Sequence, residues 1–174
     1  MFQQPLLDMR NIIAFPLLGL AVILQSAIVS QFSLLSGYAD LILILLAAWA
    51  LQEGVTTAFH WAFLASVMVS FSSHLPWFIY MAGYFNVVFV AMLLQRRIWQ
   101  APLLAMFSVT FIGTLVMHLL TYGYLRIVGE PLPFRDSMGL VTLPSLLLNL
   151  LLSIPLYGFM RDIANWVFPS PEEA

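Results

Sequence analysis

The stretch Gly37-Tyr38-Ala39-Asp40-Leu41-Ile42-Leu43-Ile44-Leu45-Leu46-Ala47-Ala48-Trp49-Ala50 decides the class of this protein. In it the carboxylate of Asp40 is followed by an apolar run that no charged or strongly polar side chain interrupts. The rest of the chain has the same character, since 62% of its 174 residues are hydrophobic. Only 8% are charged, against about 25% in an ordinary soluble domain. The sequence therefore predicts an all-α integral membrane protein whose outer surface faces lipid.

Apolar segments recur along the chain and predict a six-transmembrane-helix bundle, at about 20 residues per span. The membrane domain covers residues 11–162, between an N-terminal segment, 1–10, and a C-terminal tail, 163–174. The second span is short for a bilayer crossing and starts at Asp40. A cleaved signal peptide is an alternative for the first segment, but its apolar character continues to Ser30, which favours a retained span. The predicted spans are residues 11–30, 38–51, 55–71, 75–94, 102–124 and 140–160.

The arginines predict the orientation of this bundle. Six spans place both termini on one side, and the positive-inside rule assigns the side richer in arginine to the cytoplasm. We therefore expect a multi-pass membrane protein with both termini in the cytoplasm. The connection 126–136 is then external, where Glu130 and Asp136 balance its two arginines. The cytoplasmic arginines are Arg10, Arg96, Arg97 and Arg161, and the external ones are Arg126 and Arg135.

Composition and motifs argue against several classes of function. The chain has no cysteine and no lysine, which excludes disulfides, thiolate metal sites and Schiff-base chemistry. A formal charge of −2 without a polybasic patch argues against binding of nucleic acid. The three histidines fall on three different segments, and no catalytic or nucleotide-binding motif is present. We therefore expect no enzymatic activity, no metal and no cofactor.

Polar side chains within apolar spans are the candidate sites, because each is costly at membrane depth. Asn86 and Asn149 lie in the middle of the fourth and sixth spans, and His118 lies deep in the fifth. Gln25 lies in the first span, and His60 lies about a turn and a half into the third. The simplest interpretation of each asparagine is a hydrogen bond between helices, and the alternative is a contact with a ligand or a partner. His118 has no acidic neighbour, which favours a packed, neutral imidazole over a proton relay.

Asp40 also has two interpretations. Its carboxylate either caps the helix that begins after it or pairs with an external arginine, Arg126 or Arg135. A cap survives substitution by asparagine, whereas an ion pair does not.

The third span contains a ladder of small residues, Ala58, Ala62, Ser66 and Ser70, which recur every four positions. Small residues at this spacing let two membrane helices approach closely. The ladder predicts either internal packing of the bundle or a docking face for a partner helix.

Two stretches resemble the bacterial rod-shape-determining protein family MreD. Residues 37–43 resemble the family's Pro-Asp-Leu-Leu opening of the second span, and residues 143–157 (LPSLLLNLLLSIPLY) resemble its final span. The chain departs from the family at Ala39, where a proline is usual. It also lacks, in residues 70–74, the Gly-Leu-x-x-Asp feature found near the end of the third span.

The resemblance implies a non-enzymatic scaffold of the cell-elongation machinery, located in the bacterial inner membrane. Such a protein binds the membrane helix of the bitopic protein MreC. Through MreC it is linked to the MreB cytoskeleton, to the glycan polymerase RodA and to a class B penicillin-binding transpeptidase, which build peptidoglycan. The family's fold is similar to that of the S-components of energy-coupling-factor vitamin transporters, and an S-component is therefore the alternative function. It requires a pocket of roughly 300 Å³ or more with convergent polar groups.

Overall fold

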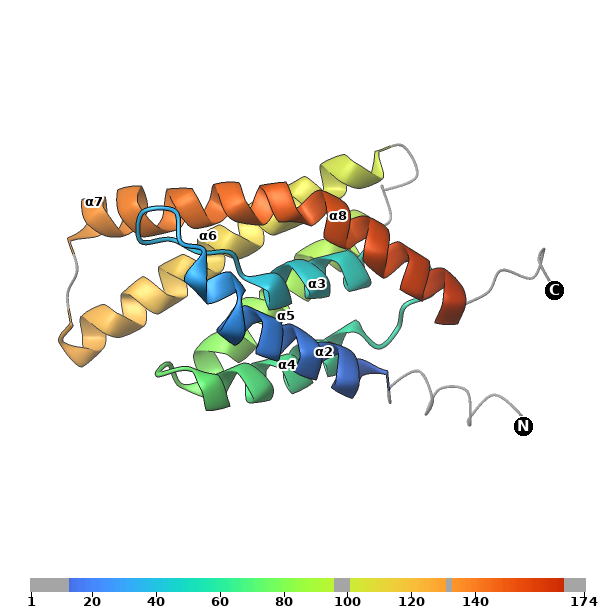
Figure 1. The fold of residues 1–174 in the computed structure, drawn as a ribbon, viewed down its shortest axis with the longest axis horizontal. Helices are drawn as coiled ribbons and strands as arrows, with labels where there is room; N and C mark the ends of the chain where they lie inside the picture. The colour runs from blue at the N-terminus through green and yellow to red at the C-terminus, as the bar shows by residue number, and fades with distance from the viewer. Residues whose placement is uncertain (1–12, 96–100, 131–132, 168–174) are drawn as a thin grey trace.

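A computed structural model describes residues 13–95, 101–130 and 133–167, and within these ranges the fold is all-helical (Figure 1). The predicted fold class is thereby confirmed at this level. Two short helical turns of non-α geometry, η1 (Val29–Gln31) and the π-helical η3 (Ser137–Thr142), flank the α-helices. The α-helices are α2 (Ala14–Ala27), α3 (Leu41–Ala50), α4 (Ala58–Ser72), α5 (Trp77–Gln95), α6 (Pro102–Val128), α7 (Phe134–Asp136) and α8 (Leu143–Val167).

Each of the predicted spans holds one α-helix, but the helices differ in length. Among the described residues, four helical stretches are long and apolar enough to cross a membrane: Ala14–Gln31, Trp77–Gln95, Pro102–Val128 and Phe134–Val167. The helices α3 and α4 are shorter, with 10 and 15 residues. The beginning of α2 (dark blue) and the end of α8 (red) lie at the same end of the bundle (Figure 1).

The last two long helices extend beyond their predicted ends. α6 continues to Val128, where Gly129 ends it in the left-handed conformation (φ 93°) that glycine adopts without steric cost. The final helix starts at α7 and passes through the π-turn η3, in which the Thr142 hydroxyl donates to the Ser137 carbonyl at 3.2 Å. It then runs to Val167 with Pro155 in its interior.

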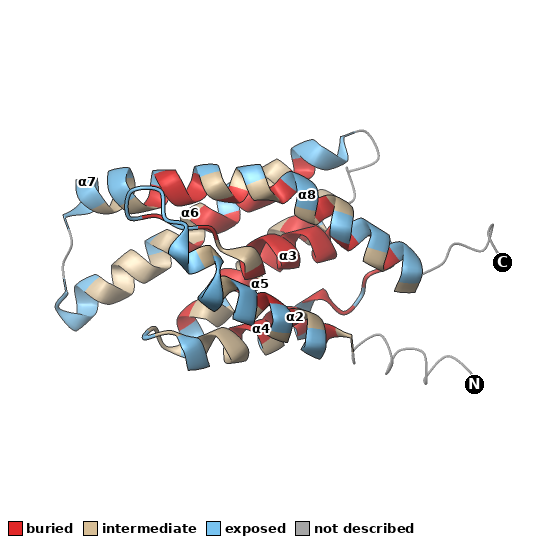
Figure 2. Cartoon of the chain, viewed as in Figure 1, coloured by how far each residue is buried: buried red, intermediate tan, exposed pale blue. Residues whose placement is uncertain are grey.

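The short helix α3 forms the centre of the bundle. It contacts α2, α4, α5, α6 and α8, and nine of its ten residues are buried. In Figure 2 it is the most uniformly buried element, whereas the outer side of α2 is exposed. A helix that is apolar on all sides suits either a protein core or lipid, and α3 takes the core position.

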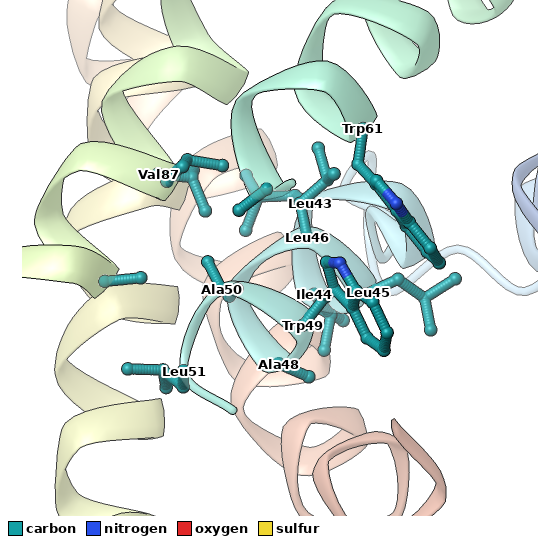
Figure 3. Close-up of a cluster of buried hydrophobic side chains, with 14 of the residues drawn as sticks. Leu43, Ile44, Leu45, Leu46, Ala48, Trp49, Ala50, Leu51, Trp61 and Val87 are labelled. Atoms are coloured by element: carbon teal, nitrogen blue, oxygen red, sulfur yellow. The ribbon is translucent and has the colours of Figure 1, made fainter. Parts of the chain in front are cut away.

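Stacked tryptophans fasten α3 to α4. The rings of Trp49 and Trp61 have centroids 4.3 Å apart and planes 20° from parallel, and both side chains are 1% exposed (Figure 3). On another side of α3, Val87 of α5 completes the apolar contact. The core is therefore built by aromatic and branched side chains around one short helix.

Candidate functional site

An extended segment, residues 37–40, leads into α3 and is held by side chains of two other helices. The Tyr38 amide donates to the Ser145 hydroxyl at 3.1 Å, and the Asp40 amide donates to Asn149 Oδ1 at 2.7 Å. Gln25 of α2 bonds on both sides of Asp40: its Oε1 accepts from the Leu41 amide at 2.8 Å, and its Nε2 donates to the Ala39 carbonyl at 2.7 Å. Non-helical backbone in a membrane bundle needs partners of this kind, because lipid offers none.

Asp40 caps α3. Its backbone is extended, and Oδ1 accepts from the Leu43 amide at 2.9 Å, as a helix N-cap does. The hydroxyl of Tyr84 lies 3.5 Å from Oδ2. Arg126 instead donates to the hydroxyl of Tyr122 at 3.0 Å, and among the described residues no arginine pairs with Asp40. The capping interpretation is confirmed, and the ion-pair interpretation is not supported.

Asn149 joins three helices. It is 1% exposed, its Oδ1 accepts from the Asp40 amide before α3, and its Nδ2 donates to Thr114 Oγ1 of α6 at 2.8 Å. Both ends of the side-chain amide are therefore satisfied inside the protein. The predicted hydrogen bond between helices is confirmed for this asparagine.

Gly37 lets the extended segment lie directly against the start of the last helix. A Cβ atom at this position would lie 2.5 Å from the Val141 carbonyl oxygen and 2.8 Å from both the amide nitrogen and the hydroxyl of Ser145. Just before it, the Ser36 amide donates to the Leu140 carbonyl at 3.0 Å. The π-turn thus supplies a carbonyl to the loop, and the contact is between backbones.

Asn86 differs from Asn149. It lies in the middle of α5, is half-buried, and its Oδ1 is shielded from solvent without a hydrogen-bond partner in the described residues. The interhelical hydrogen bond that its position predicts is not formed within the described part of this chain.

The small-residue ladder packs inside the bundle. Ala58, Ala62 and Ser66 are at most 1% exposed, and the Ser66 hydroxyl donates to the Ala62 carbonyl at 2.6 Å. Ser70 is half-buried and donates to the Val67 carbonyl at 2.7 Å. Of the two interpretations of this ladder, the structure supports internal packing, because no external helix could reach its buried residues without displacing a neighbour.

The histidines do not meet. His118 is half-buried, with Nδ1 3.1 Å from the Thr142 hydroxyl, whereas His60 and His74 are exposed. Across residues 13–95, 101–130 and 133–167, no group of three or more His, Asp or Glu side chains could hold a metal ion.

An apolar groove of about 610 Å³ lies on the side where α6 meets α8. Among the described residues, neither Asp40 nor any arginine lines it, so that part of the chain gives it no convergent polar groups of the kind that a vitamin needs. The groove is lined by Phe107, Ser108, Phe111, Ile112 and Leu150.

Comparison with known proteins gives no relative: no family model, no curated protein and no solved structure matches the chain.

The structure adds Ser145 and Thr114 to the candidate residues that sequence reasoning selected, and it gives Gln25, already a candidate, its hydrogen-bond partners. Gln25 carries a recognisable signal, because a glutamine within an apolar span needs a partner. Ser145 and Thr114 do not, since single hydroxyls are common in membrane helices and bond to their own backbone. All three act by holding Asp40 and Asn149 in place.

Proposed function

We propose that this protein is a non-enzymatic scaffold of the bacterial elongation complex, similar to MreD. In this proposal it binds the single membrane helix of an MreC-type partner and so couples the MreB cytoskeleton to peptidoglycan synthesis. One observation supports it most. The two stretches that resemble the family, residues 37–43 and 143–157, pack against each other through the Tyr38–Ser145 and Asp40–Asn149 hydrogen bonds.

This pairing gives the resemblance a physical basis. Residues separated by more than 100 positions resemble one family and also form one three-dimensional unit. The polar groups of this unit bond to one another: Gln25, Asn149 and Ser145 hold the backbone that Asp40 caps. Because its polar groups are hydrogen-bonded to one another, this unit is suited to act as a rigid platform.

The proposal includes six crossings with both termini in the cytoplasm. The extended residues 37–40 add ~13 Å at about 3.3 Å per residue, and α3 adds ~15 Å at 1.5 Å per residue. Together they cover ~28 Å, close to the ~30 Å hydrocarbon core of a bilayer. An even number of crossings also agrees with the shared end at which α2 begins and α8 ends (Figure 1).

The test is restoration of rod shape together with capture of a partner. The chain is expressed in rod-shaped bacteria depleted of their MreD, with the MreC-type protein encoded in the same genome as this chain, and affinity purification follows. We expect rod shape to return and the full-length partner to co-purify. The matched control is the same partner with its membrane helix replaced by another apolar 20-residue helix, which should be lost.

Two outcomes would contradict the scaffold. Capture of the control partner as efficiently as the natural one would show that binding is not helix-specific. Tight binding of a vitamin to the purified protein, measured by thermal shift, together with failure to restore shape would indicate an S-component instead.

A further inference from the structure

The final helix is longer than a membrane crossing needs. From Phe134 to Val167 it has 34 residues, which at 1.5 Å per residue is about 51 Å. The hydrocarbon core of a bilayer is about 30 Å thick, and the bilayer with its headgroups is about 40–45 Å thick. Part of this helix therefore lies outside the hydrocarbon.

The direction of α8 changes within its second half. Pro155 lies inside the helix, and a proline there removes a backbone hydrogen bond and kinks the helix. In Figure 1 the red end of α8 runs at an angle to its orange part. Residues 156–167, the distal arm of α8, thus leave the direction of the preceding turns.

The distal arm begins where other helices end. The Gln95 side chain at the end of α5 donates to the Gln52 carbonyl, just after α3, at 2.6 Å. The Tyr157 side chain lies beside that of Gln52. Beyond Tyr157 the arm stays packed on the core of the bundle, since Met160 is 0% and Ala164 4% exposed. The arm therefore lies along the rim of the bundle, near the level at which α3 and α5 end.

The exposed side of the distal arm has two edges of different chemistry. At 100° per residue, Arg161 and Asn165 lie along one edge, and both are exposed. Phe159 and Trp166 lie along the other edge and are 51% and 77% exposed. Asp162 lies between the two edges, with a carboxylate oxygen 3.8 Å from Arg161 Nε.

Only the boundary between lipid and water suits both edges. Charged side chains are costly in hydrocarbon, which argues against placing Arg161 and Asp162 there. Tryptophan is enriched at the headgroup level, where its ring contacts lipid and its N–H contacts water, and Trp166 has the exposure that this requires. Amphipathic helices lie in this layer with their apolar side toward the acyl chains.

We propose that the distal arm of α8 is a membrane-surface helix that binds the phospholipid headgroup layer beside the bundle. Phe159 and Trp166 insert toward the acyl chains, and Arg161 and Asn165 face water. The charges of Arg161 and Asp162 cancel, so the arm needs no anionic lipid, unlike a polybasic segment. This placement requires that α8 crosses the membrane, and it is independent of the scaffold function.

The first experiment measures the depth of each edge with spin labels. The chain has no cysteine, so single cysteines can be labelled and the protein reconstituted in phosphatidylcholine liposomes without a partner. Paramagnetic resonance gives the access of each label to oxygen, which concentrates in lipid, and to a nickel chelate, which stays in water. We expect several-fold more nickel access at Arg161→Cys and Asn165→Cys than at Phe159→Cys and Trp166→Cys.

A matched control comes from the same helix. Leu151 is 68% exposed and precedes the proline, so Leu151→Cys should show access to oxygen and not to nickel. Circular dichroism of every variant checks that the helices are retained.

The second experiment follows Trp166 without a label. Its emission is the difference between the unchanged chain and Trp166→Phe, recorded in liposomes whose lipids carry bromine at different depths. Because tryptophan at the boundary lies near the headgroups, bromine close to the headgroups should quench this emission more than bromine near the chain ends.

Four results would overturn the proposal. Nickel access that rises steadily from position 159 to position 166 would show that the arm extends into water, and its absence at all four positions would place the arm in hydrocarbon. Trp166 emission that no brominated lipid quenches would show that the ring does not contact the membrane. Nickel access at Leu151→Cys would show that α8 does not cross the bilayer, which would also contradict the proposed crossings.

Discussion

At the scale of single residues, Asp40 shows how a membrane protein uses a carboxylate to begin a buried helix. Because Oδ1 accepts from the Leu43 amide, Asp40→Asn should keep the cap, and Asp40→Ala should lower the free energy of unfolding by about 0.5–2 kcal/mol. The measurement is a denaturation curve in detergent, followed by circular dichroism. Arg126→Gln and Arg135→Gln should leave the curve unchanged, and a loss from either equal to that of Asp40→Ala would restore the ion-pair interpretation.

The two asparagines give a second prediction with a control inside the same chain. Asn149→Leu leaves the Asp40 amide without an acceptor and should cost about 1–3 kcal/mol of stability in the same assay. Asn86→Leu should cost nothing in the isolated monomer, because the Asn86 carbonyl oxygen accepts no hydrogen bond in the described chain. Equal losses from the two substitutions would contradict the distinction drawn between them.

The sequence predicts the hydrogen bond of Asp40 but not the partner of Asn149. The cap at Asp40 is a local bond over three positions, so the residue and the run after it suffice to predict it. The position of Asn149 within an apolar span predicts that its side chain has a hydrogen-bond partner. That partner is a backbone amide 109 residues away. Every residue except proline offers such an amide, so sequence alone gives no way to choose it.

At the scale of elements, the contact between the extended segment and the last helix depends on a missing side chain. Gly37→Ala would place a Cβ against backbone atoms of Val141 and Ser145, which cannot turn aside as a side chain can. We expect destabilisation of about 1–3 kcal/mol or more, as for other overpacked sites. Gly158→Ala is the control. A Cβ there meets nothing within 4 Å, and alanine favours the helix interior by about 0.5–1 kcal/mol.

The elements themselves were largely predictable, because hydrophobic runs mark buried or lipid-facing helices directly. Their ends were not. α6 passes the predicted end at 124 because its boundary is set by the left-handed Gly129, and the last helix begins before 140 because a π-turn connects α7 to α8. Within this turn the Leu140 carbonyl accepts a hydrogen bond from the Ser36 amide. This is a tertiary contact, which the local sequence does not predict.

At the scale of the whole molecule, the proposed six-crossing arrangement predicts which positions are accessible from outside the cell. Single cysteines at Ser36 and Glu130 should react with a membrane-impermeant maleimide added to intact spheroplasts, because both positions are exposed and lie on the predicted external side. A cysteine at Glu53 should react only after the membrane is permeabilised. Reaction of Glu53→Cys as fast as Ser36→Cys in intact cells would show that α3 does not cross the bilayer.

The hydrogen bonds between α8 and the backbone before α3 also have a consequence for synthesis of this protein on the ribosome. Asp40 leaves the exit tunnel 109 residues ahead of Asn149, which is ~5–20 s at about 5–20 residues per second. Throughout that interval the nascent segment has amides that only the final helix can satisfy. A message truncated before codon 143 should therefore yield a product that quality-control proteases remove, even though five of its six apolar segments are already made.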